Sequence, residues 1–205
     1  MSTNIETVMR AAPVIPVLVI EDPAHAEPIA RALVAGGLPV LEVTLRTAAA
    51  LEVMAEMKRV PGAIVGAGTV LDPAQLDAAL AAGAEFIVAP GLTERLGHAA
   101  IASGVPFLPG IANASDIMRG LDLGLTRFKF FPAMASGGLP ALKALAAPFG
   151  QCRFCPTGGI TEASAPEWLA FDPVLCVGGS WVVGQGAPDV AAVEQAARAA
   201  AALRA

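Results

Sequence analysis

Short apolar runs alternate with alanine-rich amphipathic stretches along the whole chain, and this alternation limits the possible folds more than any other feature. The runs consist mainly of Val, Ile, Leu and Phe, a composition typical of strands that are buried on both faces. Helix-start and helix-end signals separate them, such as Asp72 before Pro73 and Gly104 after an alanine-rich stretch. We expect strands over residues 14–20, 40–45, 63–70, 85–90, 106–111, 127–132, 153–157 and 174–179.

Strands that alternate regularly with helices form parallel sheets. Eight such units in 205 residues, with no linker between them, predict an α/β fold of the (β/α)8 or TIM-barrel type, with residues 1–205 as a single domain. A doubly wound open sheet is the alternative. It is disfavoured because Glu21, Asp22 and Pro23 follow the first strand, where a dinucleotide-binding fold would have glycines.

Hydrophobic residues make up 55% of the chain and charged residues 15%, against about 25% charged in a typical domain. This composition excludes intrinsic disorder and predicts that part of the surface is buried between subunits. No apolar run reaches the ~18 residues of a membrane span, and residues 1–10 lack the apolar core of a signal peptide. We therefore expect a cytoplasmic protein that does not bind membranes. The net charge of −5 and the lack of a basic stripe argue against nucleic-acid binding.

The three cysteines, Cys152, Cys155 and Cys176, raise the question of a redox or metal site. Cys152 and Cys155 form a C-x-x-C pattern, but positions i and i+3 of a strand point to opposite faces. The chain has only two histidines, both in alanine-rich helical stretches. We therefore predict packing roles for the thiols, with no disulfide and no bound metal.

Lys129 is the most unusual residue of the predicted strands, because it lies between two phenylalanines in a chain with only three lysines. Burial disfavours the charged ammonium, and the neutral amine is a nucleophile that forms a Schiff base with a carbonyl substrate. The alternative is a lysine that extends to a rim or pairs with an acid for stability. Lys58 and Lys143 lie on helical stretches, where we expect them to be solvated.

Glu42 interrupts another apolar strand, and Arg46 stands where that strand ends. A buried carboxylate is costly unless it has a partner or a task. Strand parity places Glu42, Thr44 and Arg46 on one face. Glu42 is therefore a candidate proton shuttle and Arg46 a candidate two-pronged donor to a substrate carboxylate, with a structural ion pair as the alternative.

Glycines follow the last two predicted strands, as Gly158-Gly159 and as Gly178-Gly179-Ser180. In barrels, the loops at these positions often bind phosphate through backbone N–H groups and a helix N-terminus. Glycine pairs also occur in ordinary turns. The prediction of a phosphate site therefore depends on the position of these glycines at the ends of the last two strands.

Five segments together resemble the bacterial family of 2-keto-3-deoxy-6-phosphogluconate (KDPG) and 4-hydroxy-2-oxoglutarate (KHG) aldolases. They are VLEVTLRT (40–47), IVGAGTVL (64–71), RFKFFP (127–132), RFCPTGGI (153–160) and LCVGGSW (175–181). The resemblance implies a class I aldolase without metal or cofactor, which cleaves KDPG to pyruvate and glyceraldehyde 3-phosphate in the Entner–Doudoroff pathway. It also implies cleavage of KHG to pyruvate and glyoxylate, and a homotrimer.

The resemblance further implies roles for individual residues. Lys129 would form the Schiff base, Glu42 would act as general acid and base, and Arg46 would bind the pyruvate carboxylate. The other substrate-binding positions that it implies are Thr69, Pro90, Phe131, Thr157, Gly158, Gly159, Gly179 and Ser180. Thr157 favours the gluconate-derived substrate, because the related galactonate enzyme is expected to have valine there.

Three alternatives remain open from the sequence. A galactonate-specific aldolase of the same family would share the lysine and the glutamate. A sugar-phosphate isomerase or epimerase would need a carboxylate pair, or histidine and metal ligands, at the strand ends, where Glu42 is the only acid. A barrel that binds sugar phosphates without catalysis would have no reason to bury Lys129.

Overall fold

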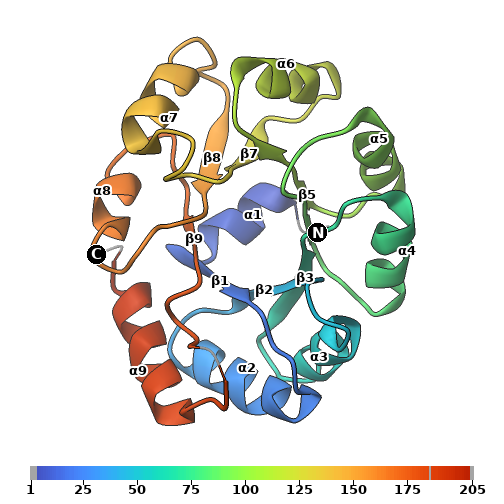
Figure 1. Cartoon of the computed structure of the whole chain (residues 1–205), viewed down its shortest axis with the longest axis vertical. Helices are drawn as coiled ribbons and strands as arrows, with labels where there is room; N and C mark the ends of the chain where they lie inside the picture. Colours follow the sequence, from blue (N-terminus) through green and yellow to red (C-terminus); the bar gives the residue numbers. More distant parts are fainter. Residues whose placement is uncertain (1–3, 185, 204–205) are drawn as a thin grey trace.

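The computed structural model describes residues 4–184 and 186–203. Parallel strands surround the centre of the molecule, and most helices lie outside them (Figure 1). The strands are β1 (Val14–Leu18), β2 (Val40–Thr44), β3 (Ile64–Gly68), β4 (Ile87–Val88), β5 (Phe107–Leu108), β6 (Gly110–Ile111), β7 (Arg127–Phe130), β8 (Arg153–Pro156) and β9 (Val177–Gly179). The helices are α1 (Ile5–Arg10), the short 3-10 helix η1 (Pro23–His25), α2 (Ala26–Ala35), α3 (Ala50–Met57), α4 (Pro73–Ala81), α5 (Glu94–Ser103), α6 (Ala114–Asp122), α7 (Gly138–Ala146), α8 (Ala165–Leu169) and α9 (Val190–Ala201).

The strands pair in two sheets, one of six strands in the order β5-β4-β3-β2-β1-β9 and one of three in the order β6-β7-β8. Every pairing is parallel, so the predicted α/β class is confirmed. The first and last strands, β1 and β9, are neighbours, which is not the order of the doubly wound alternative. Because the pairing is divided between two sheets, it does not by itself close the eight-stranded ring that we expected.

Both breaks between the sheets have a local cause. The predicted strand 106–111 is divided at Pro109, which has no N–H for a ladder, so β5 pairs with β4 whereas β6 pairs with β7. Between β8 and the segment that leads into β9, only two isolated bridges form, Phe154 with Val174 and Thr157 with Gly178. The sequence offsets of these bridges differ by one residue, and this slip interrupts the ladder.

Apolar side chains pack in two clusters, one on each face of the strands. The larger, outer cluster lies between the strands and the surrounding helices and includes Phe128 and Phe130. The smaller, inner cluster lies on the other face of the strands and contains Ile15 and Phe86. Among the described residues, no helix has both the length and the apolar character that crossing a bilayer requires.

Helix α1 closes one end of this inner space. It lies across the centre of the view in Figure 1, and its Val8 and Met9 join the inner cluster. Glu6 of α1 accepts a hydrogen bond from Nε of Arg127, the first residue of β7, at 2.9 Å. Helix α1 therefore covers the amino ends of the strands, which leaves the carboxyl ends and their loops for a site. Sequence analysis did not predict α1, because six residues are too few to show helical periodicity.

Candidate active site

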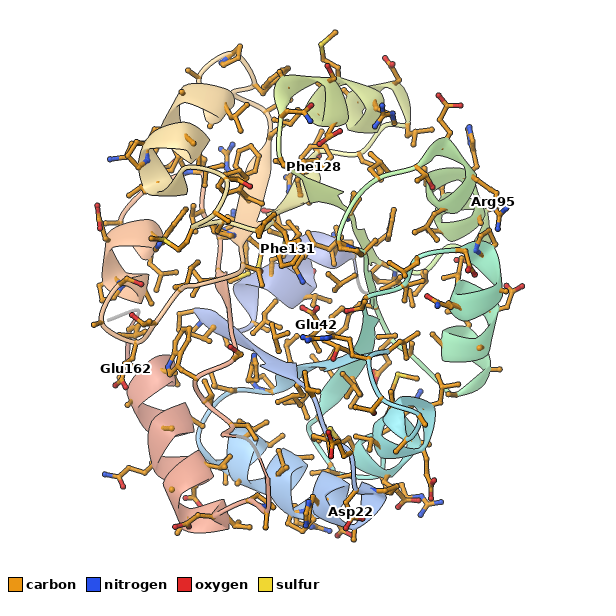
Figure 2. The ribbon with its side chains drawn as sticks, in the orientation of Figure 1. Asp22, Glu42, Arg95, Phe128, Phe131 and Glu162 are labelled. Carbon is orange, nitrogen blue, oxygen red and sulfur yellow. The ribbon has the colours of Figure 1, made fainter. Side chains whose placement is uncertain are left out.

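Lys129 and Glu42 form a buried ion pair, with 2.9 Å between Lys129 Nζ and Glu42 Oε1. The two residues come from β7 and β2 and are 87 positions apart in the sequence. Their side chains are only 7% and 4% exposed, so both charged groups are almost completely removed from water. Figure 2 shows Glu42 and Phe131 near the centre of the view, far from surface residues such as Arg95.

Strand parity turns the Lys129 side chain inward. Its neighbours Phe128 and Phe130 are fully buried in the outer cluster, so the lysine between them points to the opposite face. Its Nζ lies 5.4 Å from the centroid of the Phe131 ring, at the distance of a cation–π contact. Cys155 is paired with Lys129 in the β7–β8 ladder and projects from the same face.

The pairing gives both groups the partner that burial demands. An unpaired charge at this depth would be strongly destabilising, whereas an ion pair with a hydrogen bond compensates much of the cost of leaving water. The same 2.9 Å hydrogen bond is a path for a proton. Its transfer from Lys129 to Glu42 produces a neutral amine next to a protonated carboxyl group, which are a nucleophile and a general acid.

Thr44 and Arg46, which we expected to share a face with Glu42, have different surroundings. Thr44 is buried and donates its hydroxyl hydrogen to the carbonyl oxygen of Leu18 at 2.8 Å, which ties β2 to β1. Arg46 lies two residues beyond β2 and is exposed to solvent. The ion-pair partner of Glu42 in the structure is thus Lys129, and Arg46 lies beyond the carboxyl end of the strand.

Thr69 and Pro90 follow β3 and β4, so they lie at the same end of the strands as Arg46, and both are partly buried. Thr69 has a φ of 61°, in the left-handed region that a β-branched residue rarely adopts. Among the described residues it is the one non-glycine residue with a positive φ. Strain of this kind costs about 1–3 kcal/mol and persists where the surrounding structure imposes a functional orientation.

The loops after β8 and β9 lie side by side, because Thr157 forms a bridge with Gly178. Thr157 is buried, whereas Gly159 and Ser180 are exposed and Gly158 is partly exposed. The β7–α7 loop is fixed against this region by two hydrogen bonds, from Ala133 N–H to Thr157 O at 2.8 Å and from Met134 N–H to Gly158 O at 3.0 Å. Gly158 and Gly159 have φ values of 104° and 79°, which only glycine adopts without strain.

The two glycines of β9 each leave room for a neighbouring side chain. A Cβ on Gly178 would lie 2.7 Å from Thr157 Cγ2, and a Cβ on Gly179 would lie 2.6 Å from Trp181 Cε3. Both distances are far below van der Waals contact. Glycine at these positions therefore has a packing reason that is independent of any ligand.

Sequence analysis missed two neighbours of the ion pair, Gly68 and Cys155. A Cβ on Gly68 would lie 2.9 Å from Glu42 Cδ, and Cys155 shares the inner face with Lys129. The register of adjacent strands is the signal that could have identified them, since parallel strands with aligned carboxyl ends place equivalent positions side by side.

The predicted placement of the C-x-x-C cysteines on opposite faces is confirmed, since Cys152 lies in the outer cluster and Cys155 in the inner one. Burial raises the pKa of the Cys152 thiol, although the charges of Arg127 and Arg153 act in the opposite direction. Within residues 4–184 and 186–203, no group of three or more His, Cys, Asp or Glu side chains is placed to hold a metal ion.

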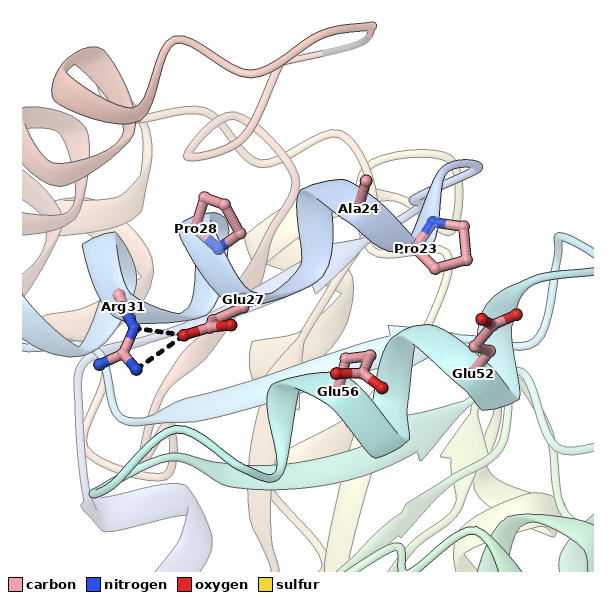
Figure 3. Close-up of a pocket in the computed structure, with 7 residues that line it drawn as sticks. All are labelled: Pro23, Ala24, Glu27, Pro28, Arg31, Glu52 and Glu56. Atoms are coloured by element: carbon pink, nitrogen blue, oxygen red, sulfur yellow. Dashed lines mark hydrogen bonds and ion pairs between the residues drawn. The ribbon is translucent and has the colours of Figure 1, made fainter.

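A groove of about 570 Å³ lies away from this site, between the η1–α2 segment and α3 on the outer surface (Figure 3). It is lined by Pro23, Ala24, Glu27, Pro28, Arg31, Glu52 and Glu56. Arg31 and Glu27 pair with each other at 2.7 Å, and both side chains are more than half exposed. This ion pair is therefore solvated, and the groove is not part of the site.

A buried lysine that shares a hydrogen bond with a buried carboxylate, within a parallel α/β fold, has the nucleophile and the proton donor that an aldolase of the Schiff-base class requires. The chain belongs to the KDPG and KHG aldolase family, whose model matches residues 5–196, so the resemblance seen in the sequence is confirmed. The 2-dehydro-3-deoxy-phosphogluconate aldolase of Zymomonas mobilis is 63% identical over 201 residues, which cover 98% of this chain and 97% of that protein.

Solved structures of the family agree with this placement. The crystal structure of the Zymomonas mobilis KDPG aldolase with 3-phosphoglycerate has a TM-score of 0.97 and 62% identity, covering 100% of this chain and 98% of that chain. The KDPG aldolase of Legionella pneumophila, with pyruvate captured as a covalent carbinolamine intermediate, has a TM-score of 0.95 and 43% identity, covering 98% of this chain and 100% of that chain.

Proposed function

We propose that this chain cleaves KDPG to pyruvate and glyceraldehyde 3-phosphate, and KHG to pyruvate and glyoxylate as a second activity. The buried ion pair carries the proposal, because the two groups that a Schiff-base aldolase needs, Lys129 and Glu42, lie 2.9 Å apart. The carbinolamine in the Legionella pneumophila enzyme is the adduct that an amine nucleophile forms with a ketone. The 63% identity to the Zymomonas mobilis enzyme supports the same substrate.

The reaction begins when the Lys129 ammonium passes a proton to Glu42 and the neutral amine attacks the C2 carbonyl carbon. Glu42 then protonates the carbinolamine hydroxyl group, which leaves as water and gives a protonated Schiff base. As the C3–C4 bond breaks, Glu42 accepts the proton of the C4 hydroxyl group, and the electron pair of the bond enters the enamine. Return of this proton to C3, followed by hydrolysis, releases pyruvate and regenerates the lysine.

The remaining residues hold the pyruvate half of the substrate around this pair. Arg46 binds the carboxylate as a two-pronged donor, and Thr69 and Pro90 line the pocket beside it. Phe131 packs against the Schiff base, a role supported by the 5.4 Å between its ring centroid and Lys129 Nζ.

The phosphate group binds at the loops after β8 and β9, through the backbone N–H groups of Gly158, Gly159, Gly179 and Ser180. No lysine or arginine occurs between positions 160 and 193, so side-chain cations are scarce in this part of the chain. The 3-phosphoglycerate in the Zymomonas mobilis structure supports a site for phosphorylated acids in the family. Thr157 contacts the substrate hydroxyl groups and favours the gluconate-derived substrate; a galactonate-specific aldolase is the alternative.

Borohydride reduction in the presence of pyruvate tests the proposal. We expect a stable pyruvyl adduct, located by mass spectrometry on Lys129, and loss of turnover by orders of magnitude in Lys129→Ala. The other lysines are internal controls, because Lys58 Nζ donates to Gly83 O at 2.7 Å on the surface and Lys143 Nζ lies 5.8 Å from the Phe171 ring. An adduct on either control lysine would contradict the assignment, and the absence of any adduct would favour an isomerase or a non-catalytic binding protein.

We also propose that residues 1–205 form one (β/α)8 barrel domain, that three copies associate as a homotrimer, and that the protein is cytoplasmic. Only Pro109 separates β5, in one sheet, from β6, in the other, and two bridges join β8 to the β9 segment; both observations support closure of the barrel. The low share of charged residues, 15%, supports burial of surface between subunits.

A further inference from the structure

Two glycines of β3, Gly66 and Gly68, face the inner space and leave room for different neighbours. A Cβ on Gly66 would lie 2.5 Å from ring atoms of Phe86, which belongs to the inner apolar cluster. A Cβ on Gly68 would instead lie 2.7 Å from Glu42 Cγ and 2.9 Å from Cδ, and closer still to Oε1. The two positions are alike in strand and in face, but the nearest atoms to an added Cβ are those of the Phe86 ring at Gly66 and those of the Glu42 side chain at Gly68.

Glycine is required at position 68 because it has no side chain, and not because of its backbone freedom. Gly68 does not have a left-handed φ, so alanine fits its backbone without strain. Distances of 2.7 and 2.9 Å to carbon atoms are far below the ~3.5–4.0 Å of optimal contact, so one of the two groups must move if a Cβ is present.

The Glu42 carboxylate is the group that would move. The β2 backbone is fixed on both sides, by the five-residue ladder with β3 and by the Thr44 hydroxyl bond to Leu18 O. The Glu42 side chain is 4% exposed, so it has no solvent into which it could withdraw. A Cβ at position 68 would therefore displace the carboxylate relative to Lys129 Nζ.

We propose that Gly68 is a positioning residue of the aldolase, which holds the Glu42 carboxylate within hydrogen-bond distance of Lys129. This inference rests on the proposed function, in which Glu42 is the general acid and base. A shift of about 1 Å in a catalytic group costs on the order of 10²-fold in rate. Gly68→Ala should therefore lower kcat about 10²-fold and change KM by less than about threefold.

The test is a mutant cycle of Gly68→Ala and Glu42→Gln, with Gly66→Ala as the matched control. Exchange of the pyruvate methyl protons for deuterium, followed by NMR at saturating pyruvate, reports the acid–base step without the phosphate half of the substrate. We expect Gly68→Ala to slow exchange and turnover by similar factors, and to slow them less than about threefold when Glu42→Gln is already present. We expect Gly66→Ala to leave the exchange rate within about threefold of wild type, although it should lower thermal stability about as much as Gly68→Ala does.

The proposal would be overturned if Gly68→Ala and Gly66→Ala slowed exchange equally. It would also be overturned if Gly68→Ala slowed exchange by the same factor in the Glu42→Gln background as in wild type. Gly68→Ala could be tested by folding alone if it failed to fold. The double variant Glu42→Ala/Gly68→Ala should then fold as well as Glu42→Ala, because the clashing Glu42 side chain is gone. A double variant that did not fold would also overturn the proposal. A wild-type protein that forms no pyruvyl adduct with borohydride would instead contradict the proposed function, so the two failures are distinguishable.

Discussion

Thr69 shows how single residues of this site are held at the expense of stability. It has a φ of 61° although it is β-branched, and it follows the strand that carries Gly68. Thr69→Gly should relieve the strain and raise the free energy of unfolding by about 1 kcal/mol, since part of the gain is offset by the greater freedom of glycine in the unfolded chain. The same variant lacks the hydroxyl group and should raise KM for KDPG.

Thr69→Val is the matched control, because valine keeps the shape and the strain but not the hydroxyl group. It should raise KM to a similar extent with no gain in stability, as measured by urea unfolding beside steady-state kinetics. A loss of stability in Thr69→Gly would show that the left-handed backbone is not strained.

The proposed phosphate site is tested best at Gly159, since the hydrogen of Gly179 faces the Trp181 ring and a side chain there would disturb packing first. Gly159 has a φ of 79°, and its Cβ would meet only the exposed side chain of Met134. Gly159→Ala strains the loop and tilts its N–H groups, so KM should rise about tenfold or more for KDPG and little for unphosphorylated KHG. Gly137→Ala, at another left-handed glycine outside the two loops, should affect both substrates equally.

At the scale of elements, the contact between α1 and β7 couples stability to pH. Hydrogen bonds from Arg10 and then Arg127 lower the pKa of Glu6 below its ordinary value of 4.5. Stabilisation by a lowered carboxylate pKa is complete above the unfolded value and is lost as the pH falls through the folded pKa. Glu6→Gln should therefore cost about 1 kcal/mol of unfolding free energy at pH 7 and almost nothing well below pH 4.5.

Urea unfolding of wild type and Glu6→Gln at several pH values measures this difference. The Arg127 side chain is 23% exposed and that of Arg10 is 55% exposed, so Arg127→Gln should cost more stability than Arg10→Gln. A Glu6→Gln effect that stays constant with pH would show that the charge of Glu6 does not stabilise the fold.

The elements that were predictable from sequence are those whose signals are local. Asp72, predicted to start a helix, caps α4 by accepting a hydrogen bond from Gln75 N–H, and Thr93 caps α5 in the same way through Leu96 N–H. Nonlocal effects were not predictable. The glycine pair Gly36-Gly37 ends α2, and the left-handed residue of the pair is Gly37, with a φ of 93°, whereas Gly36 has a φ of −77°. It is glycine because α9 packs against it, with Glu194 O 2.9 Å from where its Cβ would be.

The candidate site also combines residues that were predictable from local sequence with contacts that were not. Lys129 and Glu42 were predictable as candidates because each is a charged residue in an apolar strand, and burial makes such residues exceptional. That they pair with each other across 87 residues, and that Gly68 makes room for the carboxylate, depends on which strands are neighbours and in what register. A single strand contains no such information.

At the scale of the whole molecule, composition gives a reason for self-association that no single residue gives. Isolated exposed apolar side chains are normal on monomers. Here they accompany a chain that is 55% hydrophobic and only 15% charged, so few charges remain to separate them. The large apolar residues that are at least 40% exposed among the described ones are Val19, Leu71, Ile101, Met118, Met134 and Val190.

The proposed homotrimer predicts a sedimenting species of three times the 20.7 kDa chain mass at micromolar concentration. Because association stabilises the folded chain by mass action, the midpoint of thermal unfolding should rise with protein concentration. The double variant Lys129→Ala/Glu42→Gln is the control, because it removes both charges of the buried pair and leaves neither unpaired. Both side chains lie inside the fold, so this variant should lose turnover, for want of the proposed nucleophile, without changing the sedimenting mass. A species of one chain mass at all concentrations, with a constant unfolding midpoint, would show that this surface remains in contact with water and that each chain acts alone.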